Sequence, residues 1–163
     1  MLRKLYTLLT ALFLVLTVQE NFAQDVRYIA NFEDMSIKFL RCSVKQDNSC
    51  IVDFLMENNS VSDWSLYVTT WTSVIHKSRA YDDMGNEYSK IEIAVGNTSK
   101  YIETWDCNKA FPAGTVLKVR IKVHDISAIA TVLKRLDIDV CNAHGWGSAR
   151  KPITIFNIPI SRQ

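Results

Sequence analysis

Hydrophobic and polar residues alternate along much of the chain, with the period of two that is typical of β-strands. Residues 115–124 show this alternation most clearly. Along this run aliphatic positions alternate with basic ones: Leu117, Val119, Ile121 and Val123 against Lys118, Arg120, Lys122 and His124. The pattern predicts a half-buried strand with one basic face that meets water, and it predicts that His124 is a solvated side chain on that face.

Further segments have the composition or the alternation of strands. They are residues 35–44, 50–57, 65–75, 87–95, 99–105, 133–140 and 152–160. Turn-forming residues separate these segments, at positions 58–60, 85–86, 96–97 and 112–114. About seven to nine short strands with this spacing predict an all-β fold, namely an antiparallel β-sandwich.

Residues 125–132 interrupt the strand pattern. Their apolar residues Ile126, Ile129 and Ala130 have the spacing of one or two helical turns. A segment this short is not a stable helix by itself. We therefore predict one short helical turn that caps an end of the core, in preference to a helix that binds a partner.

The polar stretch at residues 79–88 lies between two strand-forming runs and contains Gly85. Glycine accepts the positive φ that closes a hairpin, and the neighbouring Asp and Asn side chains can bond their own backbone. Asp82, Asp83 and Asn86 could alternatively supply oxygen ligands to calcium, but the spacing is not that of an EF-hand loop. We predict a hairpin turn here, and neither a metal nor a cofactor.

Three turn motifs carry a resemblance to a known family. They are Glu57-Asn58-Asn59 at a strand end, residues 80–88 around Gly85, and Phe111-Pro112-Ala113-Gly114 before a strand. In this order they resemble secreted bacterial immunoglobulin-like domains of unknown function, a group similar in architecture to a small mycobacterial secreted antigen. The resemblance implies an immunoglobulin-like sandwich and supplies no catalytic residues. The chain departs from the simplest members in its four cysteines and in residues 141–151.

The N-terminal residues have the organisation of a secretory signal peptide. Arg3 and Lys4 precede an apolar stretch at residues 5–18, and a cleavage point follows Ala23. The Ala-Gln at this point resembles exported proteins of the Bacteroidetes. The apolar stretch is shorter than a membrane span, and no cysteine follows the cleavage point for a lipid anchor. We predict a signal peptide at 1–23, a single domain at 24–163, and a secreted or periplasmic protein that does not span the membrane.

Net charge and cysteine content narrow the picture further. Residues 24–163 contain 17 basic and 16 acidic residues, which argues against a nucleic-acid partner. The four cysteines follow the predicted signal peptide, so an exported chain is expected to form disulfides. We predict the pairs Cys42–Cys50, across the polar residues 43–49, and Cys107–Cys141, with the other two connectivities left open.

The sequence gives little support to an enzyme. Its histidines, which are His76, His124 and His144, accompany no Gly-x-Ser-x-Gly elbow. Asp137 and Asp139 lie two apart on one strand face, where a glycosidase pair is possible in principle but alternating surface charge is the commoner explanation. We therefore predict a protein without catalytic activity.

A binding site is easier to place. The segment at residues 142–151 contains glycines around an aromatic residue and two cations, and we predict that it binds a ligand through His144, Trp146, Arg150 and Lys151. Trp146 could equally fold back over the core. Trp64, Trp71 and Trp105 are expected to pack in the core or on a sheet face, where an exposed pair could stack on sugars.

These features predict a non-catalytic exported binding or adhesion module, at the cell surface or beyond, that recognises an extracytoplasmic protein or glycan. Two alternatives stay open. One is a carbohydrate-binding module, which needs a flat exposed row of aromatic side chains. The other is a secreted enzyme inhibitor that acts through a disulfide-braced loop, at residues 43–49 or 142–151.

Overall fold

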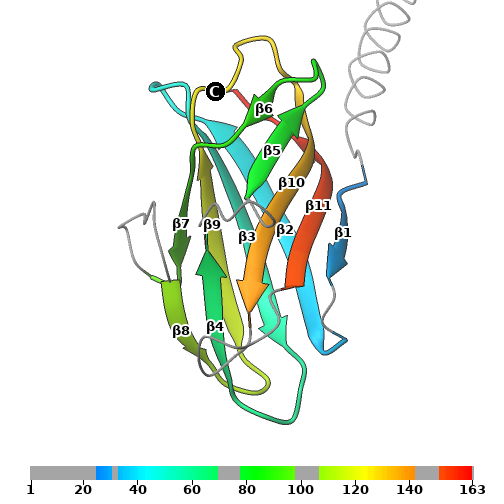
Figure 1. The fold of residues 1–163 in the computed structure, drawn as a ribbon, viewed down its shortest axis with the longest axis vertical. Helices are drawn as coiled ribbons and strands as arrows, with labels where there is room; N and C mark the ends of the chain where they lie inside the picture. Colours follow the sequence, from blue (N-terminus) through cyan, green and yellow to red (C-terminus); the bar gives the residue numbers. More distant parts are fainter. Residues whose placement is uncertain (1–24, 31–32, 70–77, 98–106, 142–150, 163) are drawn as a thin grey trace, which may run out of the picture.

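Two antiparallel β-sheets lie face to face in the chain (Figure 1). The computed structural model describes residues 25–30, 33–69, 78–97, 107–141 and 151–162. Its strands are β1 (Arg27–Ala30), β2 (Met35–Val44), β3 (Cys50–Asn58), β4 (Trp64–Thr69), β5 (Arg79–Asp82), β6 (Glu87–Tyr88), β7 (Ile91–Val95), β8 (Cys107–Phe111), β9 (Val116–Val123), β10 (Val132–Cys141) and β11 (Lys151–Pro159). The predicted all-β sandwich is confirmed, with 11 strands in the described residues where about seven to nine were expected.

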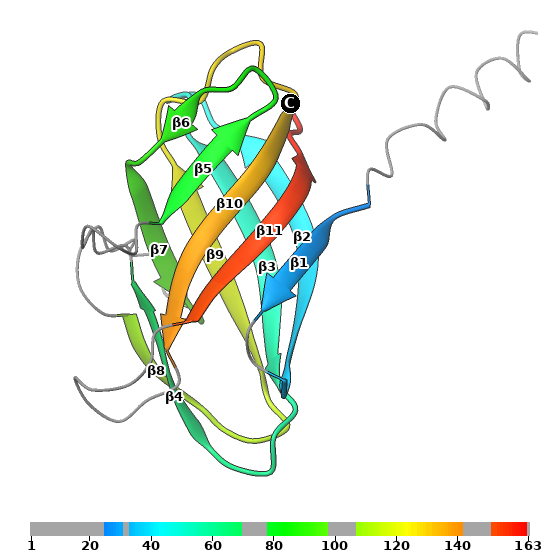
Figure 2. The same cartoon turned by 45° about the vertical axis from the view of Figure 1, so that its right-hand side comes forward.

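The strand order corresponds to that of immunoglobulin sandwiches. One sheet, which we call sheet B, has the order β2-β3-β9-β7, and the other, sheet A, has the order β1-β11-β10-β4-β8. The orders β2-β3-β9-β7 and β11-β10-β4 match the A-B-E-D and G-F-C arrangements of that fold. The short strands β5 and β6 extend sheet A, because β5 pairs with β10 beyond the end of β4 (Figure 2).

Aliphatic side chains from both sheets fill the space between them. The alternation predicted for residues 115–124 is realised in β9, where Val119, Ile121 and Val123 are fully buried and the basic residues lie on the opposite face. The large side chains of Phe54 and Phe111 complete the core. Sheet B therefore has one face in the core and one face of polar side chains in solvent, as antiparallel sheets commonly do.

The predicted strand limits agree with the structure in part. The prediction for residues 35–44 matches β2, and those for 50–57, 133–140 and 152–160 differ from β3, β10 and β11 by one or two residues. The prediction of one strand at 87–95 is wrong, since β6 belongs to sheet A and β7 to sheet B. The sequence analysis did not predict β1, β5 or β8. The predicted strand at 99–105 and the end of the one at 65–75 lie outside the described residues.

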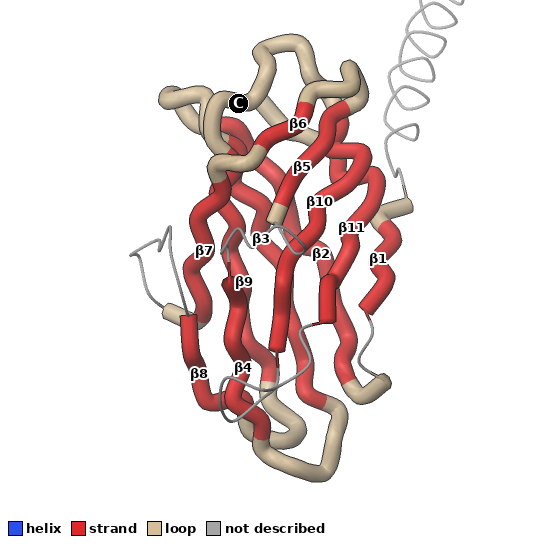
Figure 3. Tube along the Cα trace, in the orientation of Figure 1, coloured by secondary structure: helices blue, strands red, loops and turns tan. Residues whose placement is uncertain are grey.

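The predicted helical turn at residues 125–132 is wrong. The described residues contain strands, turns and bends but no helix (Figure 3), and so no helix among them is long and apolar enough to cross a membrane. Residues 127–130 instead form a turn closed by a bond from the Ala130 amide to the Ser127 carbonyl, 3.2 Å long. Ile126 is buried while Ile129 is 68% exposed, so the apolar residues do not share one face. The backbone groups of this segment form hydrogen bonds with Asn48, Tyr88 and Arg162 instead of with each other in a helix.

Candidate functional site

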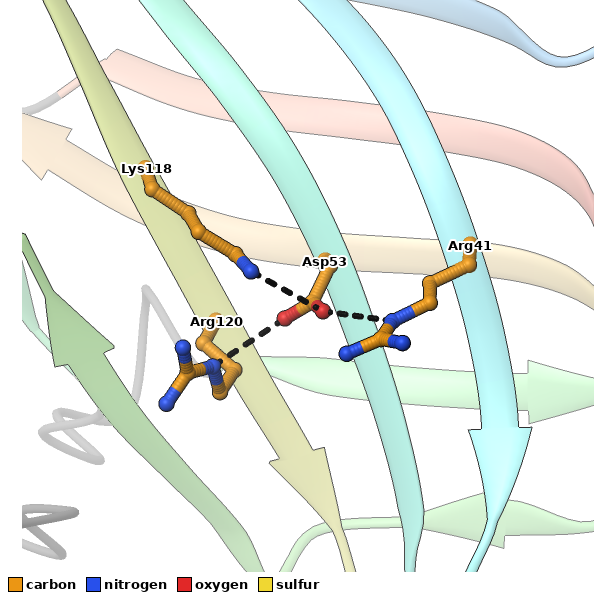
Figure 4. A network of polar contacts seen from close by, with 4 residues as sticks. All are labelled: Arg41, Asp53, Lys118 and Arg120. Atoms are coloured by element: carbon orange, nitrogen blue, oxygen red, sulfur yellow. Dashed lines mark hydrogen bonds and ion pairs between the residues drawn. The ribbon is translucent and has the colours of Figure 1, made fainter. Parts of the chain in front are cut away.

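The outer face of sheet B carries a carboxylate surrounded by three cations. The Asp53 carboxylate, on β3, forms salt bridges with three cations (Figure 4). The Arg41 Nε lies 2.8 Å from it, the Arg120 Nε 3.1 Å and the Lys118 Nζ 3.3 Å. The Asp53 side chain is only 1% exposed, whereas the Arg41 side chain is 66% exposed. We call these four residues the Asp53 cluster. Because one negative charge meets three positive ones, the cluster carries a local excess of positive charge.

The strand register explains why these residues meet. Arg41, Asp53 and Arg120 occupy one row across β2, β3 and β9, and Lys118 lies two positions from Arg120 on the same face. The pairing of β2 with β3 shifts by one residue between Phe39 and Arg41. This bulge turns Arg41 to the outer face, because a slip of one residue reverses the side on which every following side chain lies.

Burial and the cations act in opposite directions on the pKa of Asp53. Loss of solvent raises the pKa of the carboxyl group, but the hydrogen bond from Arg41 and the charge and hydrogen bond of Lys118 lower it more. The pKa of Asp53 therefore lies below its usual value. The carboxylate stays ionised at neutral pH, and its charge and bonds orient the three cations.

Other polar pairs flank the cluster on the same sheet face. Ser36 donates to Glu57 at 3.0 Å, and the Lys122 Nζ lies 3.2 Å from Asp47. The prediction of a solvated His124 is wrong, because its side chain is 14% exposed. Its Nε2 lies 3.0 Å from Glu92 Oε1 but is buried without a hydrogen bond to the described residues. The period of two cannot reveal this burial, because it depends on the neighbouring strand β7, where Glu92 lies.

We expect Asp53→Asn to lower the free energy of unfolding by about 2 kcal/mol, because three cations then face each other without their carboxylate. Their partial exposure keeps the loss below that of a fully buried pair. Urea unfolding measures the loss, which should shrink in high salt because salt screens the repulsion.

Asp137→Asn is the matched control for this change. Asp137 lies in sheet A, is 17% exposed and pairs with the 53% exposed Arg135. Asp137→Asn should lower the free energy of unfolding by less than about 1 kcal/mol. Equal losses for the two variants, or a loss at Asp53 that salt does not change, would refute the electrostatic role of Asp53.

A second polar network holds the loops at the opposite end from the β3–β4 turn. Asp82 is 3% exposed, and its carboxylate accepts bonds from the Met84 amide, the Asn86 amide and side chain, and the Tyr88 hydroxyl, at 2.6–2.9 Å. Tyr88 in turn accepts the Ser127 amide at 3.1 Å. These bonds stabilise the β5–β6 turn and fasten it to residues 124–131.

This geometry agrees with the predicted hairpin turn. Gly85 has a φ of 86°, which glycine adopts without strain. The Asp82 oxygens are all bonded to protein donors, and Asp83 accepts the amide and hydroxyl of Thr131. No group of three His, Cys, Asp or Glu side chains in the described segments could hold a metal ion. The carboxylates of this turn serve the fold.

Most of the predicted loop site lies outside the described residues. His144, Trp146 and Arg150 lie outside the described residues, as do Trp71 and Trp105. Lys151 begins β11, but its side chain is outside the description. Trp64 is half-buried and packs edge-to-face on Phe111 with ring centroids 6.2 Å apart, so its predicted packing role is confirmed.

Cys42 and Cys50 lie next to each other in the core. Both are buried, and their sulfur atoms are 2.6 Å apart as thiols. The hydrogen bond with Cys50 and burial raise the pKa of the Cys42 thiol. The other two cysteines lie on either side of β4, since Cys141 pairs with Tyr67 and Cys107 pairs with Val68. Strands separated by a third strand are about 10 Å apart, beyond the usual Cα spacing of a disulfide.

We propose that Cys42 and Cys50 form a disulfide in the exported protein. A protein-disulfide oxidant of the export compartment would accept the two electrons and two protons that the thiols lose. Intact mass should then fall by about 2 Da relative to the reduced chain, and peptide mapping should recover the 42–50 linkage. Two free thiols at these positions would contradict the proposal. The predicted Cys107–Cys141 pair does not fit this strand pairing, because β4 lies between the two residues, and a loss of about 4 Da would contradict the arrangement.

The Asp53 cluster was not predicted from the sequence. The alternation at residues 118–122 indicates a basic strand face but does not show that an acid lies between its cations. A signal was nevertheless present, because Asp53 is the acidic residue at the centre of the strand-forming run 50–57. An acid within an apolar strand indicates that cations lie on the neighbouring strands.

No protein-family model matches the chain, and no curated protein matches it. Among solved structures, the chain is similar to a family 123 glycoside hydrolase from Clostridium perfringens, described in a study of glycolipid glycan hydrolysis. The TM-score is 0.42 and the sequence identity is 9%, over 80% of this chain and 28% of that chain. The chain thus spans less than a third of that enzyme's length, and a similarity of this strength carries no functional argument.

Proposed function

We propose that the chain is a non-catalytic binding module that acts outside the cytoplasm. The observation that supports this proposal is the Asp53 cluster. It presents oriented charged groups on the outer face of a regular sheet, and side chains held on strands are positioned more accurately than those on loops. A flat face with fixed polar groups is suited to recognising an extended ligand.

The proposed location rests on the signal peptide predicted for residues 1–23, which lie outside the described residues. The proposed Cys42–Cys50 disulfide would agree with it, because disulfides persist in oxidising compartments. The proposed kind of protein is therefore an exported immunoglobulin-like domain, as the sequence resemblance implies. The carbohydrate-binding alternative stays a prediction, since Trp71, Trp105 and Trp146 lie outside the described residues. The inhibitor alternative, through residues 43–49 or 142–151, also stays a prediction.

The test combines fractionation with ligand capture. The protein should be recovered from the periplasm or the medium, and the immobilised protein should retain a glycan or protein ligand reversibly and unchanged. Recovery in the cytoplasm would refute the proposed location. Release of a chemically altered ligand, at a rate that scales with protein concentration, would refute the non-catalytic role.

A further inference from the structure

We propose that the outer face of sheet B binds an anionic polysaccharide, and that Arg41, Arg120 and Lys118 contact its carboxylate or sulfate groups. This inference rests on the proposed function and names the site and the ligand class. Asp53 is the positioning residue, because it contacts the cations and is itself covered by them.

The orientation of the two arginines is the first argument. Each guanidinium donates to Asp53 through Nε, at 2.8 Å for Arg41 and 3.1 Å for Arg120. Figure 4 draws these contacts at Nε and shows the terminal nitrogens of Arg120 turned away from the Asp53 carboxylate. Two terminal nitrogens of an arginine form a planar fork that matches a carboxylate or a sulfate. Asp53 thus fixes two forks while leaving their terminal nitrogens available to a ligand.

The charge of the face is the second argument. Asp53 is hidden, so the cluster exposes its cations and conceals its one negative charge. Lys38 is exposed on the same face of β2. The other acids of the face lie outside the row of Arg41, Asp53 and Arg120, because Glu57 is opposite Val116, Glu92 is opposite Lys122 and Asp47 lies 3.2 Å from Lys122. The centre of the face therefore attracts anions.

The cations come from two strands of one sheet face, β2 and β9, which suits a ligand with several anionic groups. Arg41 and Arg120 share one row across the sheet with β3 between them, so their backbones are about 10 Å apart. Lys118 lies two residues from Arg120 along β9, a distance of about 7 Å. The Nε and Nζ atoms of the three cations converge on the single Asp53 carboxylate, so a ligand would meet the terminal guanidinium nitrogens and the exposed Lys38 in the neighbouring row. A chain with repeated anionic groups can contact these separate donors together.

Two other classes of partner fit less well. A protein interface usually has an apolar centre. On this face the most exposed of the described large apolar residues are Leu40 and Val116, and both lie beside the cluster instead of at its centre. Nucleic-acid binding usually requires a strongly basic domain, but the chain has a net charge of only +2. An anionic polysaccharide needs neither feature, because its contacts are charge-assisted hydrogen bonds to separate groups.

The experiment measures binding of the purified exported protein to four immobilised polymers. Polygalacturonate carries carboxylates, heparin carries sulfates, dextran is neutral and poly-L-glutamate is an acidic polypeptide. We expect binding to one or both anionic polysaccharides, weaker in high salt, and none to dextran. The combined change Arg41→Gln and Arg120→Gln should lower the affinity at least about tenfold.

Arg135→Gln is the matched control. Arg135 also binds a carboxylate through Nε, at 2.8 Å from Asp137, but it lies in sheet A. Its substitution should change the affinity less than about twofold, and thermal melting should show that every variant is folded. Asp53→Asn should also weaken binding, while Asp53→Glu should restore part of it.

The outcomes separate this inference from the proposed function. Failure to bind either anionic polysaccharide, equal losses with Arg135→Gln, or equally tight binding of poly-L-glutamate would overturn the inference. If the protein instead retains a neutral glycan or a protein, and the double variant retains it equally well, the binding module stands without this site. Cleavage of a bound polymer would overturn the non-catalytic function.

Discussion

Asp82→Asn is expected to lower the free energy of unfolding by about 2–3 kcal/mol, which is close to 10 °C in melting temperature for a domain of this size. The Asp82 carboxylate accepts four bonds, two at each oxygen. An asparagine has one acceptor oxygen and one amino group, so the amino group must face two donors. Asn86 can turn its side chain, but Tyr88 already accepts the Ser127 amide and needs an acceptor for its own hydrogen.

The neighbouring change Asp83→Asn serves as the control for Asp82→Asn. Asp83 bonds Thr131 at a more exposed position, and an asparagine oxygen can keep one of these bonds. Its loss should stay near 1 kcal/mol. A double-mutant cycle with Tyr88→Phe tests the network directly, because Asp82 and Tyr88 share a hydrogen bond and their losses should not add. Additive losses would show that the two side chains act independently.

The folded protein is expected to lose stability steadily as the pH falls below about 4. Burial raises the pKa values of the Asp53, Asp82 and Asp83 carboxyl groups, but their hydrogen bonds and, at Asp53, the cations lower them more. The unfolded chain therefore binds protons at a higher pH than the folded one. The stability that these groups supply is complete above the unfolded pKa and disappears as the pH falls through the folded pKa.

Urea unfolding between about pH 6 and about pH 2 measures this dependence. Asp82→Asn should show a shallower decline than the unchanged protein, because it lacks one of the linked carboxyl groups. Asp137→Asn serves as the comparison in sheet A. A stability that does not change with pH, or an equal slope for Asp82→Asn, would contradict the assignment of these carboxylates.

The sequence was sufficient to predict the architecture because the signal is local. Aliphatic and basic residues alternate from Leu117 to Val123, and this alone assigns a strand and its two faces. Gly85 likewise marks a turn without any knowledge of distant residues. The error at residues 87–95 has a tertiary cause, because Ser89 and Lys90 carry the chain from sheet A to sheet B inside one run of strand-forming residues.

The site depends on long-range pairing and was therefore not predicted. Arg41 and Asp53 meet because of the bulge in β2, and Arg120 joins them only once β9 pairs with β3. Long-range contacts also explain why the helical turn predicted at residues 125–132 is wrong. The backbone groups of this segment bond Tyr88 and Arg162, which are distant in sequence, instead of forming a helix.

We propose sheet B as the recognition surface, whereas the sequence pattern indicated the loop at residues 142–151. Both segments carry arginine and lysine, so composition does not decide between them. The two segments differ in how firmly their cationic side chains are held in place. Arg41 and Arg120 are held by a buried carboxylate on regular strands, and such preorganisation reduces the entropy lost on binding.

Mapping backbone amide chemical shifts during titration with polygalacturonate oligosaccharides tests the central claim most directly. We expect the largest shifts around Arg41, Asp53, Lys118 and Arg120 on β2, β3 and β9. We also expect added salt to reverse them. Shifts confined to residues 142–150, or no shifts with this ligand or with a sulfated one, would contradict the claim.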